Sequence, residues 1–202
     1  MFTGIVRGYV PVQKIEKKEG MNTITLLFEP DFLDGIITGS SIALDGVCMT
    51  VIAVNDSEAS FDIMEESLRV TTLGGLQVGD HVNVERAAKM GDEIGGHVVS
   101  GHVSAKAEIT DIQKVSHDVS MTFSMVNKWM KYIIHKGFIS VDGVSLTVVE
   151  PKDDTFRVHL IPETLENTSL GHKKVGELVN IEIDPMTQAI VDTTERILAE
   201  KI

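Results

Sequence analysis

The sequence Asp45-Gly-Val-Cys-Met-Thr-Val51 has a second copy, Asp142-Gly-Val-Ser-Leu-Thr-Val148. Each copy begins with Asp-Gly, the strongest short signal for a hairpin turn, and continues with the alternation of a strand. Side chains two positions apart share a strand face. We therefore expect Cys48 and Thr50 to form a small polar face, which Ser145 and Thr147 repeat. Two related pockets would follow; two ordinary strands with one solvated face each are the alternative.

The two copies belong to a longer duplication with an offset of 143 − 46 = 97 residues. At this offset residues 66–85 align with residues 163–182 without a gap, and ten of the twenty positions are identical. Unrelated sequences of ordinary composition would match at about one or two of these positions. The repeat is too long for a solenoid unit and has the size of a small domain.

Each half has many short predicted strands and little predicted helix. Strands are expected at 2–6, 23–28 and 59–64 and again at 99–103, 119–125 and 155–161, with helical turns at 31–37 and 128–135. A Val-Asn-Val or Val-Asn-Ile strand ends each half. This pattern predicts an all-β fold with one small closed barrel per half, because closure removes free strand edges.

The repeat also predicts the domain boundaries. We expect a first barrel at residues 1–86, a linker at 87–97, a second barrel at 98–186 and a helix at 187–202. Asp184 and Pro185 have the residue types of an N-cap and a first helical turn. An apolar stripe follows at helical spacing: Ile190, Val191, Thr194, Ile197 and Leu198. We expect this helix to mediate self-association; packing against its own barrels is the alternative.

Composition excludes several classes of function. The 202 residues have a formal net charge of −12, which disfavours sequence-independent binding to nucleic acid. The single cysteine rules out an intrachain disulfide and favours a reducing compartment. Neither a signal peptide nor an apolar stretch of membrane-spanning length is recognisable, so we expect a soluble cytoplasmic protein. Nucleotide-binding loops and zinc-ligand spacings are not found either, and we expect no metal.

The candidate chemical residues also have structural interpretations. Cys48 is favoured as functional because it shares a polar strand face with Thr50. His97 and His102 would lie on opposite faces of an extended segment, so they should not share a metal, although either could transfer protons near neutral pH. His97 is equally explained as a structural hydrogen-bonding residue. Asp142 and its counterpart are first of all turn residues, whose carboxylates often cap their own backbone.

Several motifs together resemble the riboflavin synthase family over residues 1 to about 198. These are Met1-Phe-Thr-Gly-Ile-Val6, the two Asp-Gly heptamers, Asn83-Val-Glu-Arg-Ala-Ala88, Asp92-Glu-Ile-Gly-Gly-His97, Ser100-Gly-His102, Lys136-Gly-Phe-Ile139 and Leu160-Ile-Pro-Glu-Thr-Leu165. The resemblance implies two similar six-stranded Greek-key β-barrels and a C-terminal helix that assembles a homotrimer. It further implies dismutation of two 6,7-dimethyl-8-ribityllumazine molecules by four-carbon transfer, without cofactor or metal. Association with lumazine synthase is possible.

The resemblance also implies which residues form the sites. The first pocket would use Cys48, Met49, Thr50, Asp62, Ile63, Met64, Glu65, Glu66 and Ser67, where the family leads us to expect threonine in place of Ser67. The second would use Ser145, Leu146, Thr147, Ile161, Pro162, Glu163, Thr164, Leu165 and Glu166 with Gly4, Ile5 and Val6. Gly101, His102, Val103 and Lys136 would line a shared interface, with Phe2 packed at the site. We expect Cys48, His102 and Ser145 to carry chemistry, supported by His97, Asp142, Ser41 and Asp184.

Two other functions are alternatives to this one. Lumazine proteins resemble the same fold but bind lumazine without turnover. Ser100-Gly-His102, Lys136-Gly-Phe138 and the Ser145 heptamer argue against that reading, because they preserve the second pocket. A reductase flavin domain is the other alternative, and the internal repeat and missing nucleotide motif disfavour it.

Overall fold

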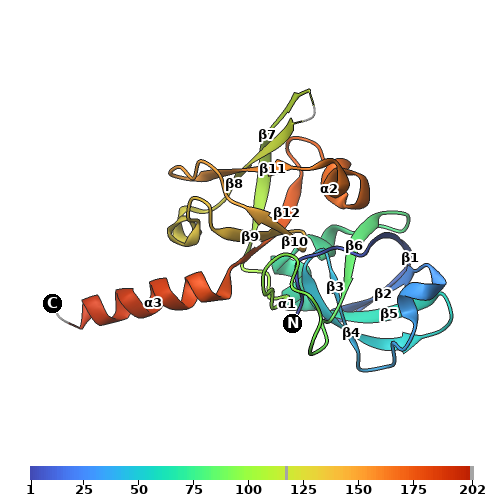
Figure 1. The fold of residues 1–202 in the computed structure, drawn as a ribbon. Helices are drawn as coiled ribbons and strands as arrows, with labels where there is room; N and C mark the ends of the chain where they lie inside the picture. The colour runs from blue at the N-terminus through green and yellow to red at the C-terminus, as the bar shows by residue number, and fades with distance from the viewer. Residues whose placement is uncertain (117, 201–202) are drawn as a thin grey trace.

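The computed structural model describes residues 1–116 and 118–200, and it contains two tandem β-barrels and a C-terminal helix (Figure 1). The first half forms a closed barrel in the order β1-β2-β5-β4-β3-β6. Its strands are β1 Gly8–Lys18, β2 Met21–Leu27, β3 Ser41–Leu44, β4 Val47–Val54, β5 Glu58–Met64 and β6 His81–Arg86. The closed barrel predicted for the first half is therefore confirmed.

The second half repeats this strand order with a weaker closure. Its strands are β7 Ala105–Val115, β8 Asp118–Ser124, β9 Phe138–Val141, β10 Val144–Thr147, β11 Thr155–Leu160 and β12 Leu178–Ile183. They form one sheet in the order β10-β9-β12-β7-β8-β11, and only the isolated pair Val149–Arg157 joins its two ends. Strand β10 is shorter than β4 because Glu150 has a left-handed φ of 48° and Pro151 cannot donate a backbone hydrogen bond.

Each barrel has its own hydrophobic core, to which several strands contribute by alternation of buried and more exposed residues. In β5, for example, Ala59, Phe61 and Ile63 are buried between more exposed neighbours. The same alternation appears in both heptamers: Cys48 and Thr50 lie on the more exposed face of β4, as predicted. The equivalent face of β10 carries Ser145 and Thr147. The inward faces therefore hold the barrels together while the outward faces remain free for other contacts.

The openings of the two halves differ from the prediction. Residues 2–6 and 99–103 do not form strands; Phe2 and Val99 make only an isolated antiparallel pair. Gly4 and Gly101 have φ values of 74° and 84°, which turn the chain at both places. The extended geometry expected between His97 and His102 is therefore wrong, and the first strands begin later, at β1 and β7. We refer to residues 2–6 and 99–103 as the opening loops.

Short helices connect the strands. The expected helical turns are the 3₁₀ helices η1 Pro30–Leu33 and η3 Asn127–Tyr132. After β5 and β11 the structure adds α1 Glu65–Val70, α2 Pro162–Asn167, η2 Thr72–Gly75 and η4 Ser169–Gly171, which were not predicted. These helices place residues 65–67 and 162–166 at the rim of each barrel.

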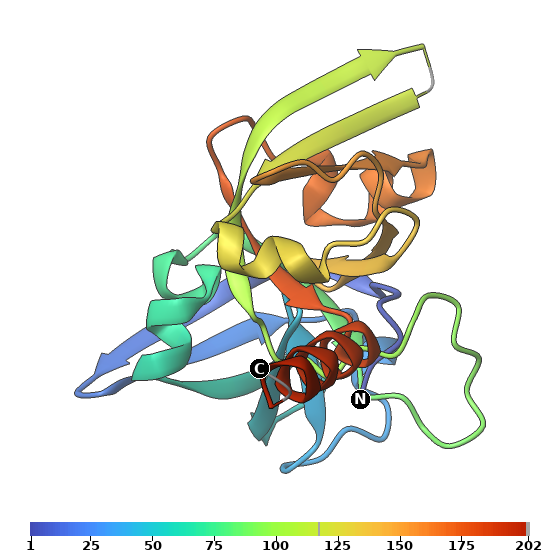
Figure 2. The same cartoon turned by 90° about the vertical axis from the view of Figure 1, so that its left-hand side faces the viewer.

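The C-terminal helix α3 Pro185–Ala199 projects from the second barrel, as Figures 1 and 2 show from two sides. Asp184 caps it as predicted: its Oδ2 atom accepts a hydrogen bond of 2.9 Å from Thr187 N. The whole helix is free of buried residues. The predicted segment extends to residue 202, and its last two residues lie outside the described part of the chain.

Candidate functional site

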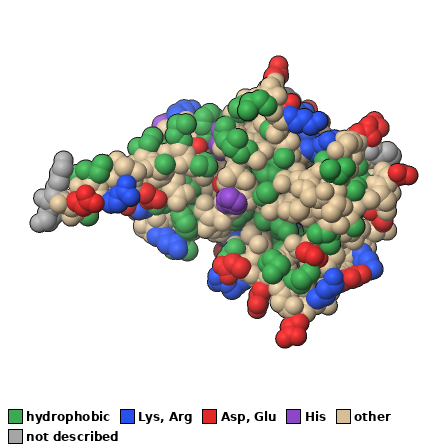
Figure 3. Space-filling view, turned by 90° about the horizontal axis from the view of Figure 1, so that it is seen from below, with side chains coloured by type: hydrophobic (Ala, Val, Ile, Leu, Met, Phe, Trp, Pro, Cys, Tyr) green, Lys and Arg blue, Asp and Glu red, His purple; other side chains and the backbone are tan. Residues whose placement is uncertain are grey.

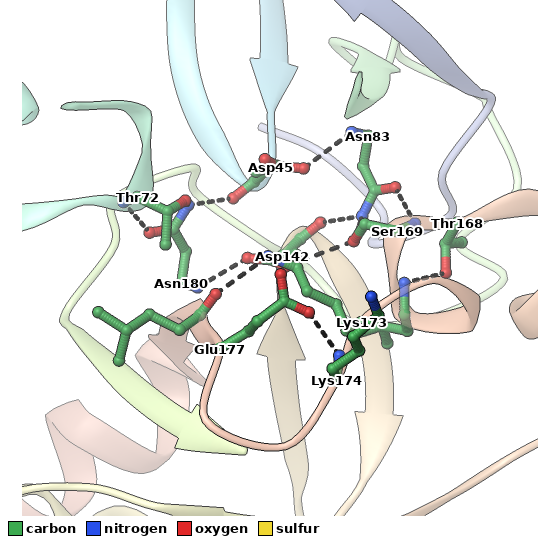
Figure 4. A network of polar contacts seen from close by, with 12 residues as sticks. Asp45, Thr72, Asn83, Asp142, Thr168, Ser169, Lys173, Lys174, Glu177 and Asn180 are labelled. Carbon is green, nitrogen blue, oxygen red and sulfur yellow. Dashed lines mark hydrogen bonds and ion pairs between the residues drawn. The ribbon is translucent and has the colours of Figure 1, made fainter. Parts of the chain in front are cut away.

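The two Asp-Gly turns meet at the seam between the barrels (Figure 4). Each aspartate accepts a hydrogen bond from the last strand of its own barrel: Asp45 Oδ1 from Asn83 N at 2.8 Å and Asp142 Oδ1 from Asn180 N at 2.7 Å. The asparagine side chains then cross the seam, since Asn83 Nδ2 donates to Asp142 O and Asn180 Nδ2 donates to Asp45 O. The expectation that these carboxylates cap their own turns is therefore wrong, and the duplicated residues form a pseudo-two-fold joint instead.

Asp142 lies inside this joint. Its side chain is fully buried, its Oδ2 atom is 3.7 Å from Lys173 Nζ, and Ser169 Oγ donates a long hydrogen bond to it. Burial raises the pKa of Asp142 to about 6, although Lys173 opposes this increase. Burial, followed by the charge of Asp142, also raises the pKa of Asp45. The contacts of Asp142 connect the barrels, and its catalytic role stays a prediction.

The opening loops cross the seam, so each barrel is completed by the other half. Cys48 N donates to Gly101 O at 2.9 Å, and Ser145 N donates to Gly4 O at 2.8 Å. A Cβ atom on Gly101 would lie 2.5 Å from Cys48 Cβ, and one on Gly4 would lie 2.5 Å from Ser145 Cβ. Only glycine permits both the turn and this close approach.

The residues that follow these glycines also contact the barrel of the other half. Val103 packs against the core of the first barrel, and Val6 packs against the core of the second. Ile5 is half-buried beside them, whereas the side chain of His102 is exposed. The loops therefore bring Gly101, His102 and Val103 to the predicted first pocket and Gly4, Ile5 and Val6 to the second.

The first polar face joins β4 to the rim of its barrel. Cys48 is half-buried and packs against the buried ring of Phe2, while Thr50 is exposed and is paired in register with Ser41 of β3. At the rim, Asp62 accepts a hydrogen bond of 2.6 Å from Thr23 Oγ1. The other predicted rim residues are exposed or half-buried on the first turns of α1: Met64, Glu65, Glu66 and Ser67. Met49 and Ile63 instead point into the core.

The second polar face differs from the first by a histidine. Ser145 Oγ lies 2.6 Å from His97 Nδ1, and the imidazole ring is buried and stacked on Phe138 with 5.1 Å between centroids. Burial lowers the pKa of His97, opposed by the charge of Asp184, which favours the neutral form of the ring. A neutral imidazole can accept the proton of the Ser145 hydroxyl or donate a hydrogen bond to its oxygen. The linker thus gives the second barrel a hydrogen-bonded histidine–serine pair.

The remaining predicted residues of the second pocket differ in their burial. Thr147 and Lys136 are exposed; Lys136 adopts a left-handed φ of 65° and donates its backbone N–H to Val148 O. Leu146 is buried in the second core. The rim at α2 carries the exposed or half-buried residues Ile161, Pro162, Glu163, Thr164, Leu165 and Glu166. Of the predicted second pocket, the structure brings Gly4 directly against Ser145.

The larger cavities lie away from both polar faces. One of about 560 Å³ follows the seam beside Tyr9, Lys106 and Lys173, and another of about 650 Å³ lies beside Arg7 and Glu85. Neither is lined by Cys48 or Ser145. We give more weight to the paired polar faces, because their equivalent residues and loops converge twice in one chain.

Over residues 1–116 and 118–200, no group of three or more His, Cys, Asp or Glu side chains is placed to hold a metal ion. In the same part of the chain, no helix is long and apolar enough to cross a membrane.

Comparison with known proteins agrees with the duplication. The family model described as lumazine binding domain matches twice, at residues 3–87 and 100–184. A riboflavin synthase from Escherichia coli (strain K12) is 52% identical over 202 residues, covering 100% of this chain and 95% of the relative. This chain belongs to the riboflavin synthase family. Another family member, from Buchnera aphidicola subsp. Schizaphis graminum (strain Sg), is 45% identical over 203 residues and covers 100% of this chain and 98% of the relative.

Solved structures with the same fold include complexes of LumP. LumP complexed with riboflavin has a TM-score of 0.83 at 26% identity, with 91% of this chain and 100% of that chain covered. LumP complexed with 6,7-dimethyl-8-(1'-D-ribityl) lumazine has a TM-score of 0.81 at 25% identity, with 90% and 98% covered. The fold of the riboflavin synthase family is therefore shared with proteins crystallised with lumazine and flavin ligands.

Sequence reasoning gave no role to two buried glutamates of this family member, Glu85 and Glu182. Both accept hydrogen bonds from the opening loops. The sequence does contain a signal for them, because each glutamate stands two positions after the asparagine of the repeated Val-Asn dipeptide. Their partners could not be inferred, because the loops are distant in sequence and do not form strands.

Proposed function

We propose that this chain converts two molecules of 6,7-dimethyl-8-ribityllumazine into riboflavin and 5-amino-6-(D-ribitylamino)uracil by transferring a four-carbon unit. The observation that carries the proposal is the pair of polar strand faces, each covered by the opening loop of the other half. A reaction between two copies of one substrate calls for two similar binding surfaces. The full-length similarity to riboflavin synthases supports the same conclusion.

Positioning would supply a large part of the rate. If a first polar face and a second polar face come together, each with a bound lumazine, their pseudo-two-fold relation would hold the two lumazine rings in opposed orientations. This orientation would select the carbons that join. Holding two reactants in such a geometry gives effective molarities of about 10⁵ M or more. The ribityl chains would bind among the rim residues at α1 and α2, where hydroxyl, carboxylate and backbone groups are concentrated.

The difference between the faces suggests different chemical roles. On the second face, the Ser145–His97 pair would move a proton to or from the bound lumazine. On the first, Cys48 would act as a nucleophile or proton donor, and the exposed His102 would complete the contact with the second substrate. Ser41 would support the first face through Thr50, its register partner on β4. Asp184 would support the second face through its negative charge, which acts on His97.

Assembly and location are part of the proposal. A homotrimer would be formed through the exposed α3 helix, and it could associate with lumazine synthase. We expect a cytoplasmic location, supported by the single cysteine.

The decisive experiment uses purified protein and 6,7-dimethyl-8-ribityllumazine, with no metal or nucleotide added. Riboflavin is followed by its long-wavelength absorbance and the uracil product by chromatography. We expect one riboflavin for every two lumazines consumed. Lumazine consumption without riboflavin, or riboflavin in another ratio, would contradict the proposed dismutation.

A non-catalytic lumazine-binding antenna is the second candidate, favoured by the structural similarity to LumP. Tight binding of lumazine without any riboflavin would support it. We prefer the synthase because the second face retains Ser145 and its histidine partner, which simple binding does not require.

A further inference from the structure

Glu85 and Glu182 hold the two opening loops in equivalent ways. Glu182 Oε1 accepts hydrogen bonds from Ser100 N at 2.6 Å and Ser100 Oγ at 2.7 Å, and its Oε2 accepts one from Gly101 N at 2.9 Å. Glu85 Oε1 accepts from Thr3 N at 2.7 Å and Thr3 Oγ1 at 2.8 Å, while its Oε2 accepts from Gly4 N at 3.1 Å. Three donors thus converge on each carboxylate.

Each of these carboxylates belongs to one barrel and acts on the site of the other. Glu182 lies on β12 of the second barrel, but the Gly101 carbonyl that it orients accepts the N–H of Cys48 in the first. Ser100 Oγ, which donates to Glu182, also accepts a hydrogen bond of 3.2 Å from His102 N. Glu182 is therefore linked to Cys48 and His102 by short chains of hydrogen bonds.

Glu85 mirrors this arrangement on the other side of the seam. It lies on β6 of the first barrel and orients Gly4, whose carbonyl accepts the N–H of Ser145 in the second. Both glutamates are almost completely buried, with exposed fractions of 6% for Glu85 and 3% for Glu182. Burial raises the pKa of both carboxyl groups, and the hydrogen bonds from the loops oppose that increase. A buried acceptor with three donors is costly to disturb.

We propose that Glu182 and Glu85 are crossed positioning residues, with Glu182 setting the geometry of the Cys48 site and Glu85 setting that of the Ser145 site. This inference rests on the proposed function for its effect on turnover. The effect on geometry can be measured without turnover, because the chain has a single thiol and that thiol lies in one of the two sites.

Substitution by glutamine tests the role of the carboxylate with little change in volume. The amide oxygen can still accept both hydrogen bonds from Ser100, but the NH₂ group then faces Gly101 N–H, donor against donor. Glu182→Gln should therefore displace the Gly101 carbonyl and lower kcat by about ten- to a hundredfold, as expected for small displacements at an active site. Glu85→Gln is the matched variant, with the same clash at Gly4.

Alkylation of the thiol by iodoacetamide, followed by mass spectrometry, separates the two sites. Glu182→Gln should change the rate of Cys48 alkylation by at least about threefold through altered exposure and thiolate environment, whereas Glu85→Gln should leave it within about 1.5-fold. In a background with the thiol moved, Cys48→Ser with Ser145→Cys, the two variants should exchange their effects. This crossed pattern is not expected from a general loss of stability.

Ser100→Ala and Thr3→Ala provide a second pair of variants, in which both carboxylates are kept. They test the same hydrogen-bond connections if a glutamine variant does not fold. Ser100→Ala should affect Cys48 alkylation in the original background, and Thr3→Ala should affect the thiol at position 145. Equal effects of both substitutions at both thiols, or no effect at either, would overturn the proposal. Wild-type protein that makes no riboflavin would refute the proposed function, while the alkylation pattern would still decide the positioning roles.

Discussion

Cys48 and Ser145 occupy equivalent positions in the duplicated halves, yet their surroundings differ. Ser145 Oγ is hydrogen-bonded to a buried histidine, whereas the Cys48 side chain packs beside Phe2. The duplication explains the shared strand geometry, because both residues follow an Asp-Gly turn. The histidine has no counterpart, since His97 precedes the first residue that the repeat aligns. Divergence at this position would let one barrel specialise in proton transfer.

The chemical role of the thiol leads to a residue-scale prediction. Cys48→Ala should lower the rate of riboflavin formation by about a hundredfold or more, since loss of a nucleophile or proton donor typically removes such a factor. Lumazine binding, measured by fluorescence titration, should persist because the rim residues are untouched. Thr50→Ser serves as a control on the same strand face and should retain most of the turnover. Near-normal turnover of Cys48→Ala would remove the thiol from the mechanism.

The buried Asp142 predicts a pH dependence of stability. Its pKa is raised from 3.8 to about 6 in the folded protein, so the folded state holds this proton more tightly than the unfolded state. The resulting stabilisation is fully present below about pH 4 and is lost as the pH rises through about 6. The difference in unfolding free energy between wild type and Asp142→Asn should therefore fall by about 2 kcal/mol from pH 4.5 to 7.5.

Urea unfolding at four pH values in this range measures that difference. Asp153→Asn, at an exposed aspartate, is the control and should keep the wild-type pH dependence. Parallel curves for wild type and Asp142→Asn would show that Asp142 does not take up a proton on folding in this range.

At the scale of elements, the alternation of several strands was predicted well, but the first strand of each half was misplaced. The pattern placed strands at residues 2–6 and 99–103, whereas β1 and β7 begin at residues 8 and 105. In β1 a proline at position 11, a bulge between Val12 and Lys14, and a charged exposed end obscure the period of two. Helices α1 and α2 have only six residues each, too few for a visible helical period.

The contact between the two Asp-Gly turns predicts unequal costs for equivalent substitutions. Gly46 and Gly20 both have positive φ values, 80° and 75°, so alanine at either position costs about 1–2 kcal/mol in backbone strain. A Cβ atom on Gly46 would also lie 2.7 Å from Gly143 N, whereas one on Gly20 would meet nothing within 4 Å. Gly46→Ala should therefore be destabilising by about 1–3 kcal/mol more than Gly20→Ala in urea unfolding. Equal losses would mean that the seam adjusts without cost.

At the scale of the whole molecule, contacts within one chain account poorly for the exposed apolar residues of α3. It contacts its own barrel through Val191 and a few polar pairs, including Tyr132 OH to Asp192 at 2.5 Å. Its apolar residues Met186, Ile190, Ile197 and Leu198 are exposed, and Figure 3 shows hydrophobic side chains along the helix and over the adjoining body. An exposed apolar stripe of this kind is typical of an interface.

Removal of residues 187–202 should therefore yield smaller species in light scattering and lower activity. Each barrel should stay folded, because the helix contributes no buried residue to either core. Lys131→Ala, which removes the ion pairs of Lys131 with Glu195 and Asp192 and its contact over the Tyr132 ring, is the control and should keep the oligomeric state. An unchanged oligomer after truncation would place the intersubunit contacts elsewhere.

The sequence by itself determined the duplication, the barrel class, the two polar strand faces and the cap of the last helix. These follow from local rules, since alternation sets strand faces and an Asp-Pro pair starts a helix. The tertiary structure decided the crossing of the opening loops, the pairing of His97 with Ser145 and the burial of both glutamates. Each of these depends on contacts between residues far apart in sequence, whose geometry arises only when the two barrels pack against each other.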